Sequence, residues 1–88
     1  MNKKVYVANL SSQASELELK TLFSRAGDVV SVKIVADRQT RQPKGIAFVE
    51  MSTQWEARRA VSMLNRTDFM GKNLLVKEAT VKRGFREQ

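Results

Sequence analysis

The chain has 88 residues, of which 42% are hydrophobic and 28% are charged, and this composition supports one small domain with a well-solvated surface. It has no cysteine and no histidine, which excludes disulfides, Cys/His metal sites, thiol nucleophiles and imidazole catalysis, so we expect no metal and no cofactor. Sixteen basic against nine acidic residues give a formal charge of +7, which favours a polyanionic partner: RNA, DNA or an anionic membrane.

The first third of the chain predicts a strand followed by a helix. Lys4 to Leu10 alternates, with aliphatic side chains on one face and Tyr6 on the other. Ser15 to Glu18 has the pattern of a capping box, which predicts the start of a helix that runs to about Ala26 and is stopped by Gly27. Its apolar positions have helical spacing and predict a buried stripe of Leu19, Leu22, Phe23 and Ala26.

The next segments predict two strands joined by a long loop. Val29 to Val35 is rich in β-branched residues, and Val32 and Ile34 should face the core while Lys33 faces outward. The polar stretch from Ala36 to Lys44 predicts a mobile hairpin loop that carries the cations Arg38, Arg41 and Lys44.

Lys44 to Met51 predicts the third strand. One face is small and apolar, but the other carries Phe48 where a soluble strand normally shows polar groups, and an exposed ring is costly unless something uses it. Thr53 to Glu56 resembles a second capping box and predicts a helix to Leu64.

The end of the chain predicts a connection, a last strand and a tail. Asn65 to Lys72 reads as the connection, and Asn73 to Ala79 as a strand with Leu74 and Val76 inward and Leu75 and Lys77 outward. Residues 81–88 have no packing pattern and predict a short, flexible, basic tail after a domain that spans residues 1–80.

The element order βαββαβ predicts an α+β, ferredoxin-like fold. With right-handed crossovers, two helices cover one face of a four-stranded antiparallel sheet, and the first and third strands become central neighbours. Tyr6 and Phe48 then share the bare face, rimmed by Lys33, Lys77, Glu50 and the loop cations. Rings in a cationic surround suit single-stranded nucleic acid. The alternative is that the tail or a partner protein covers both rings.

Two short segments resemble the signatures of one family. Val5 to Leu10 is similar to the shorter ribonucleoprotein signature, and Lys44 to Met51 is similar to the longer one, K/R-G-F/Y-G/A-F-V-x-F/Y. From Lys4 to Ala79 the chain resembles the RNA recognition motif. It departs at Ile46, which replaces a binding-face aromatic, and at Met51, which should point into the core. Its short form and Thr67 to Gly71 look most like small bacterial RNA-binding proteins, including cyanobacterial ones.

The resemblance implies how the face would work. Tyr6 and Phe48 would stack two successive bases, Lys44 would contact phosphate, and Lys33 and Lys77 would tune which bases are accepted. Ile46 would contact sugars without stacking, which predicts weaker binding than in a member with three rings. The basic tail would add affinity or be plain solvated disorder; its candidate residues are Lys82, Arg83, Phe85 and Arg86. The expected partner is single-stranded RNA, with some single-stranded DNA binding.

Several other functions compete with this interpretation. A protein-binding variant of the fold uses its helical face and an Arg-x-Phe motif, which Thr67 to Phe69 lacks. Trp55 lies off the buried stripe, and either Arg59 covers its ring or it contacts a protein. An enzyme such as an acylphosphatase needs a loop with a convergent arginine, whereas Ser11 to Ala14 has neither glycine nor arginine, so we expect no enzyme. Double-stranded DNA suits a flat sheet poorly.

The segments also bear on location. No apolar run approaches the ~20 residues needed to cross a bilayer, and Met1 to Lys4 does not resemble a signal peptide. We therefore expect no membrane partner. The resemblance to small bacterial RNA-binding proteins implies a cytoplasmic location, and we expect a monomer.

Overall fold

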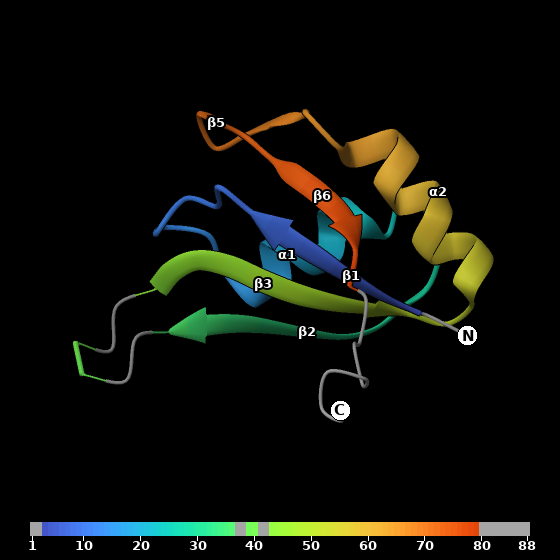
Figure 1. Ribbon diagram of the computed structural model, residues 1–88, viewed down its shortest axis with the longest axis horizontal. Helices are drawn as coiled ribbons and strands as arrows, with labels where there is room; N and C mark the ends of the chain where they lie inside the picture. The colour runs from blue at the N-terminus through green and yellow to red at the C-terminus, as the bar shows by residue number, and fades with distance from the viewer. Residues whose placement is uncertain (1–2, 37–38, 41–42, 80–88) are drawn as a thin grey trace, which may run out of the picture.

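The computed structural model describes residues 3–36, 39–40 and 43–79. Four strands form one antiparallel sheet in the order β2-β3-β1-β6, and two short strands form a separate hairpin. Figure 1 shows the four strands side by side, with α1 behind them. This confirms the predicted ferredoxin-like βαββαβ arrangement. The elements are β1 (Lys4–Ala8), α1 (Glu16–Phe23), β2 (Val29–Ala36), β3 (Pro43–Met51), α2 (Gln54–Leu64), β4 (Asp68–Phe69), β5 (Lys72–Asn73) and β6 (Leu75–Glu78).

The core lies between the sheet and the two helices. Strand alternation sends every second side chain of β1 and β3 into it, including Val5, Val49 and Met51, all fully buried. The predicted stripe of α1 packs against these residues in the same cluster, together with Ala57, Ala60 and Leu64 of α2. Phe23 is the largest fully buried side chain, and burying a side chain of this kind contributes about 1.5–3 kcal/mol. Within the described residues, both helices therefore cover one face of the sheet and no element covers the other.

Helix α1 begins as predicted and ends earlier. The Ser15 hydroxyl accepts from the Glu18 N–H at 3.1 Å, and the Ser15 N–H donates to the Glu18 carboxylate at 2.9 Å, which completes the capping box. The helix ends at Phe23 rather than Ala26. The next residues tighten into a turn, in which the Ala26 N–H donates to the Phe23 carbonyl at 2.9 Å.

Helix α2 begins at a cap that also ties it to the α1–β2 loop. The Thr53 hydroxyl accepts from the Glu56 N–H at 3.1 Å. The Glu56 carboxylate accepts from the Ser52 hydroxyl and from the Asp28 N–H, the latter at 3.2 Å. Gly27 lies so close that a Cβ there would be 2.5 Å from Glu56 Cγ. Gly27 therefore serves this close contact instead of ending α1.

The connection after α2 contains a hairpin that the sequence pattern did not predict. Strands β4 and β5 pair Asp68 with Asn73, and the Leu74 N–H bonds back to the Thr67 carbonyl at 3.0 Å. The sheet strand β6 consequently begins at Leu75 rather than Asn73, with Leu74 and Val76 buried as expected. None of the helices in residues 3–36, 39–40 and 43–79 is long and apolar enough to span a membrane.

Candidate nucleic-acid interface

A single row of side chains crosses the open face. Phe48 of β3 lies opposite Tyr6 of β1 and, on its other side, opposite Lys33 of β2. Tyr6 in turn lies opposite Lys77 of β6. Because side chains alternate along each strand, this row points away from the buried Val5 and the helices. Strand register thus places two rings at the centre of the sheet, with one lysine at each end.

The two rings touch without stacking on each other. The Met51 N–H donates to the Lys3 carbonyl at 2.8 Å, so Lys3 and Met51 form a hydrogen-bonded pair. Because hydrogen-bonded and non-hydrogen-bonded pairs alternate between antiparallel strands, Tyr6 and Phe48 form a non-hydrogen-bonded pair, in which side chains approach closely. Their ring centroids are 5.6 Å apart and their planes are tilted by 57°. Phe48 is 36% exposed and Tyr6 is half-buried. Each ring therefore offers its own separate surface.

The Lys77 ammonium completes one end of the row. Its Nζ lies 5.5 Å from the centroid of the Tyr6 ring, a cation–π distance. This contact places a positive charge beside the Tyr6 ring. Lys33 is exposed at the opposite end, on the edge strand β2.

A second row beside the rings is apolar. Two residues further along each strand stand Val35, Ile46, Ala8 and Leu75, with Val35 opposite Ile46 and Ala8 opposite Leu75. Ile46 is half-buried and Leu75 is 48% exposed. Ile46 therefore lies on the open face as predicted. Leu75 was expected to face outward but was not included among the site residues, although its spacing of two from Lys77 already places it there.

The glycine in the longer signature has a structural cause. β1 ends in a bulge, in which Asn9 has a φ of 59° and the Leu10 N–H donates to the Gly45 carbonyl at 3.0 Å. Gly45 has a φ of 79°, and a Cβ there would lie 3.3 Å from the Leu10 carbonyl oxygen. Only glycine meets both conditions without strain.

The structure brings together five of the predicted site residues, and the others lie wholly or partly outside the described residues. Tyr6, Ile46, Phe48, Lys33 and Lys77 share one face, as the register shows. Met51 is in the core, as expected. The backbone of Lys44 belongs to β3, but its side chain is outside the described part of the structure. Also outside the described residues lie Arg38, Arg41, Lys82, Arg83, Phe85 and Arg86.

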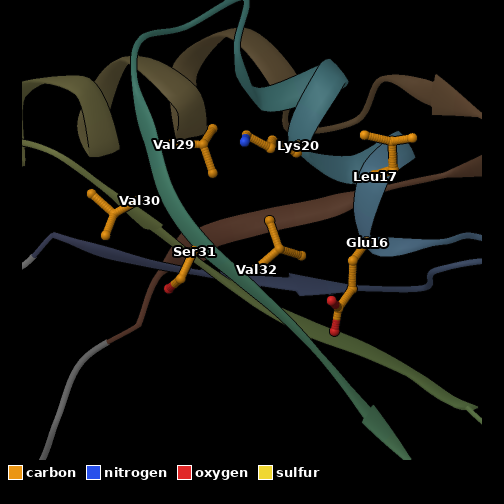
Figure 2. Close-up of a pocket in the computed structure, with 7 residues that line it drawn as sticks. All are labelled: Glu16, Leu17, Lys20, Val29, Val30, Ser31 and Val32. Carbon is orange, nitrogen blue, oxygen red and sulfur yellow. The ribbon is translucent and has the colours of Figure 1, made fainter.

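The helical side presents different chemistry. Trp55 is 65% exposed, and Arg58 lies over its ring at 5.4 Å, rather than the predicted Arg59. Arg58 also approaches the Glu78 carboxylate at 3.8 Å. A hollow of about 340 Å³ lies between α1 and β2. Figure 2 shows the side chains that line it: Glu16, Leu17, Lys20 and residues 29–32. That hollow contains no ring and one lysine, so it lacks what nucleobases need.

Comparison with known proteins identifies the family. The RNA recognition motif description matches residues 5–75. The putative RNA-binding protein RbpA of Nostoc sp. is 37% identical over 75 residues, 85% of this chain and 74% of its own length. A solved Sxl-lethal protein/RNA complex has a TM-score of 0.80 and 34% identity, covering 88% of this chain and 47% of that one.

Some relatives are much longer than this chain. Human cleavage stimulation factor subunit 2 is 39% identical over 85 residues, which are 97% of this chain but 15% of that protein. The likeness to cyanobacterial RbpA confirms the resemblance expected from the sequence. With two signature strands adjacent at the centre of an open sheet and the family description matching most of the chain, this protein belongs to the RNA recognition motif family of RNA-binding domains.

Proposed function

We propose that the open sheet face binds a short single-stranded RNA, with one base stacked on Tyr6 and the next on Phe48. The observation that carries this proposal is the cross-strand row, in which two partly exposed rings are flanked by a lysine on each side. Stacking on an aromatic side chain is worth about 1–3 kcal/mol per base and tolerates any base, since every base has a π-face.

The ring geometry favours single strands over duplexes. Bases stacked in a helix are about 3.4 Å apart, whereas the two ring centroids are 5.6 Å apart and tilted by 57°. Two bases that each cover one ring must therefore separate from their own stack. A loop or an unpaired strand does so at small cost, while a paired duplex resists it.

The two lysines of the row act on different phosphates. Four strands spaced about 4.8 Å apart put Lys33 and Lys77 roughly 14 Å from each other, too far to share one phosphate. Neither lysine is in an ion pair with a described residue. Both charges are thus available to the RNA backbone, and Ile46 beside them offers apolar contact to a sugar.

Three finer features follow from the same arrangement. Single-stranded DNA should also bind, because base stacking does not sense the 2′-hydroxyl. We propose a non-catalytic monomer, in which the predicted basic tail of residues 81–88 adds phosphate contacts. A cytoplasmic location stays a prediction, since the relatives include a chloroplast ribonucleoprotein.

The test is a double variant, Tyr6→Ala with Phe48→Ala, measured by fluorescence anisotropy on a randomised eight-nucleotide RNA. Both rings lie outside the buried core, so circular dichroism should report a folded protein. Loss of two stacking contacts should weaken binding by at least about 30-fold. Trp55→Ala is the matched control, because it removes an exposed ring from the helical side and should leave affinity unchanged. A folded double variant with wild-type affinity would show that charge attraction alone holds the RNA.

Trp55 supports a second candidate, a protein contact on the helical side. Its indole is largely exposed yet fixed beside Arg58, and aromatic and arginine side chains are enriched at protein interfaces. Because Trp55 is the single tryptophan in the chain, its emission reports on that side alone. If RNA changes Trp55 emission while the NMR signals of Tyr6 and Phe48 stay fixed, the sheet proposal is wrong and the helical face is the binding surface.

A further inference from the structure

A hollow of about 480 Å³ opens beside the ring row, where β1 ends and β3 begins. Its walls come from three parts of the chain: the sheet face, the loop after β1 and the hairpin strand β5. The volume falls in the range of small-ligand sites. The lining residues are Tyr6, Ala8, Asn9, Leu10, Ser11, Ser12, Gly45, Ile46 and Lys72.

Small side chains and the bulge keep this hollow open. Ala8 and Gly45 fill little space, and Ile46 stands where the family signature has a larger ring. The bulge at Asn9 turns the chain out of the sheet, so the following loop forms a wall of the hollow. Ile46, which replaces an aromatic residue of the signature, therefore leaves room next to Tyr6.

Hydrogen bonds hold the hairpin against this loop. The Asn9 Nδ2 donates to the Asn73 carbonyl at 2.8 Å. The Asn73 side chain in turn donates to the Arg66 carbonyl at 2.7 Å and to the Asp68 carboxylate at 3.2 Å. Lys72, next to Asn73, is thereby positioned at the hollow. The wall is preorganised, which lowers the entropy lost on binding.

The polar groups at the hollow have unused hydrogen-bonding capacity. With Nδ2 committed, the Asn9 Oδ1 remains as an acceptor, and Ser12 makes no side-chain bond to a described residue. The Ser11 hydroxyl accepts from the Gln13 N–H at 3.0 Å and keeps its own proton to donate. The Lys72 ammonium forms no ion pair within the described chain.

We propose that this hollow is a third nucleotide subsite, which takes the nucleotide next to the one stacked on Tyr6. The base edge bonds to the Asn9 and Ser12 side chains, and the phosphate lies at Lys72. A hydrogen-bonded edge discriminates between bases, whereas the two stacking rings do not. The subsite rests on the proposed function, because the neighbouring base must be held on the sheet.

The test compares dinucleotides with trinucleotides of each of the four RNA bases by NMR titration. For at least one base, the third nucleotide should tighten wild-type binding about five- to tenfold, with new shifts at the amides of Asn9, Ser12 and Lys72. Lys72→Ala and Ser12→Leu should abolish that gain and leave dinucleotide affinity within about twofold. Lys20→Ala, an exposed lysine on α1, is the matched control and should keep the gain.

The outcomes separate this subsite from the sheet proposal. The subsite proposal is wrong if no third nucleotide of any base tightens binding, or if the gain in affinity persists in both variants. In either case, dinucleotide binding would still support the proposal that the two rings bind RNA. Dinucleotide binding that is unchanged in Tyr6→Ala overturns the sheet proposal instead. Since Ser12→Leu changes packing in a loop, Lys72→Ala supplies an independent reading from an exposed side chain.

Discussion

Replacing Ile46 by phenylalanine should strengthen RNA binding at the rings. Ile46 lies two residues before Phe48 on β3, opposite Val35, and it is half-buried on the open face rather than in the core. A larger side chain can extend into the hollow beside it without displacing core atoms. The free energy of unfolding should therefore change by no more than about 0.5 kcal/mol.

The expected gain follows from what a ring adds to an apolar contact. An aromatic contact contributes about 0.5–1.5 kcal/mol beyond the area it buries, which corresponds to roughly two- to tenfold tighter binding. The same ring narrows the hollow that we assign to a third nucleotide. Ile46→Phe should consequently tighten dinucleotide binding and shrink the additional gain from a trinucleotide.

The assay is an NMR titration of wild type, Ile46→Phe and Ile46→Leu with dinucleotides and trinucleotides. Ile46→Leu is the matched control, because it keeps the apolar volume without a ring. Equal dinucleotide affinities for the leucine and phenylalanine variants would refute the reasoning and mean that the missing ring is compensated elsewhere, for which Phe85 is the first candidate. If the gain in affinity from dinucleotide to trinucleotide is the same in Ile46→Phe as in the wild type, the side chain at position 46 does not affect binding in the hollow.

Two further predictions concern charge. With about 3–4 phosphates neutralised, log K should fall against log salt with a slope of roughly −2 to −3, and Lys72→Ala should make the slope shallower by about 0.7; a slope near zero would reject the cationic rim. The hydrogen bonds from the Ser52 hydroxyl and the Asp28 N–H hold the pKa of Glu56 below its ordinary value of 4.5. Because the pKa is lower in the folded than in the unfolded protein, the ionised carboxylate stabilises the fold at pH values above its ordinary pKa. This stabilisation is lost as the pH falls through the pKa of the folded state. Glu56→Gln should therefore lower the urea midpoint at pH 7 but progressively less below pH 4.5, and equal midpoints at pH 7 would contradict this.

The placement of the rings was predictable from the sequence because it depends on local rules. Because side chains alternate along a strand, Tyr6 points to the face of the sheet opposite that of Val5 and Val7. In the same way, Phe48 points to the face opposite that of Ala47 and Val49. The order of elements with right-handed crossovers then makes β1 and β3 neighbours. One rule of short range, applied to both strands, and one rule of topology are enough to place the two rings side by side.

The hairpin and the ring partner of Trp55 depend on geometry that such rules do not contain. Gly71, with a φ of 82°, is a turn signal between β4 and β5, but Arg66 and Met70 adopt positive φ values of 68° and 55° although neither is glycine. Arg58 and Arg59 are both helical neighbours of Trp55, at three and four residues. Arg58 also reaches Glu78, a residue whose proximity only the folded sheet establishes.

The hollow depends both on residues that local sequence rules place and on contacts that only the folded chain establishes. Its floor comes from Ala8, Gly45 and Ile46, which the signature strands already contain, but its wall depends on a bond between Asn9 and Asn73, 64 residues apart. In the sequence of the strand alone, Ile46 is only the replacement of an aromatic residue. In the folded chain its smaller side chain leaves the hollow open, so that the loop polar groups and Lys72 can reach the nucleotide next to the one that Tyr6 holds. A protein that stacks two bases without choosing between them would gain its base preference there, since hydrogen bonds to a base edge are what distinguish one base from another.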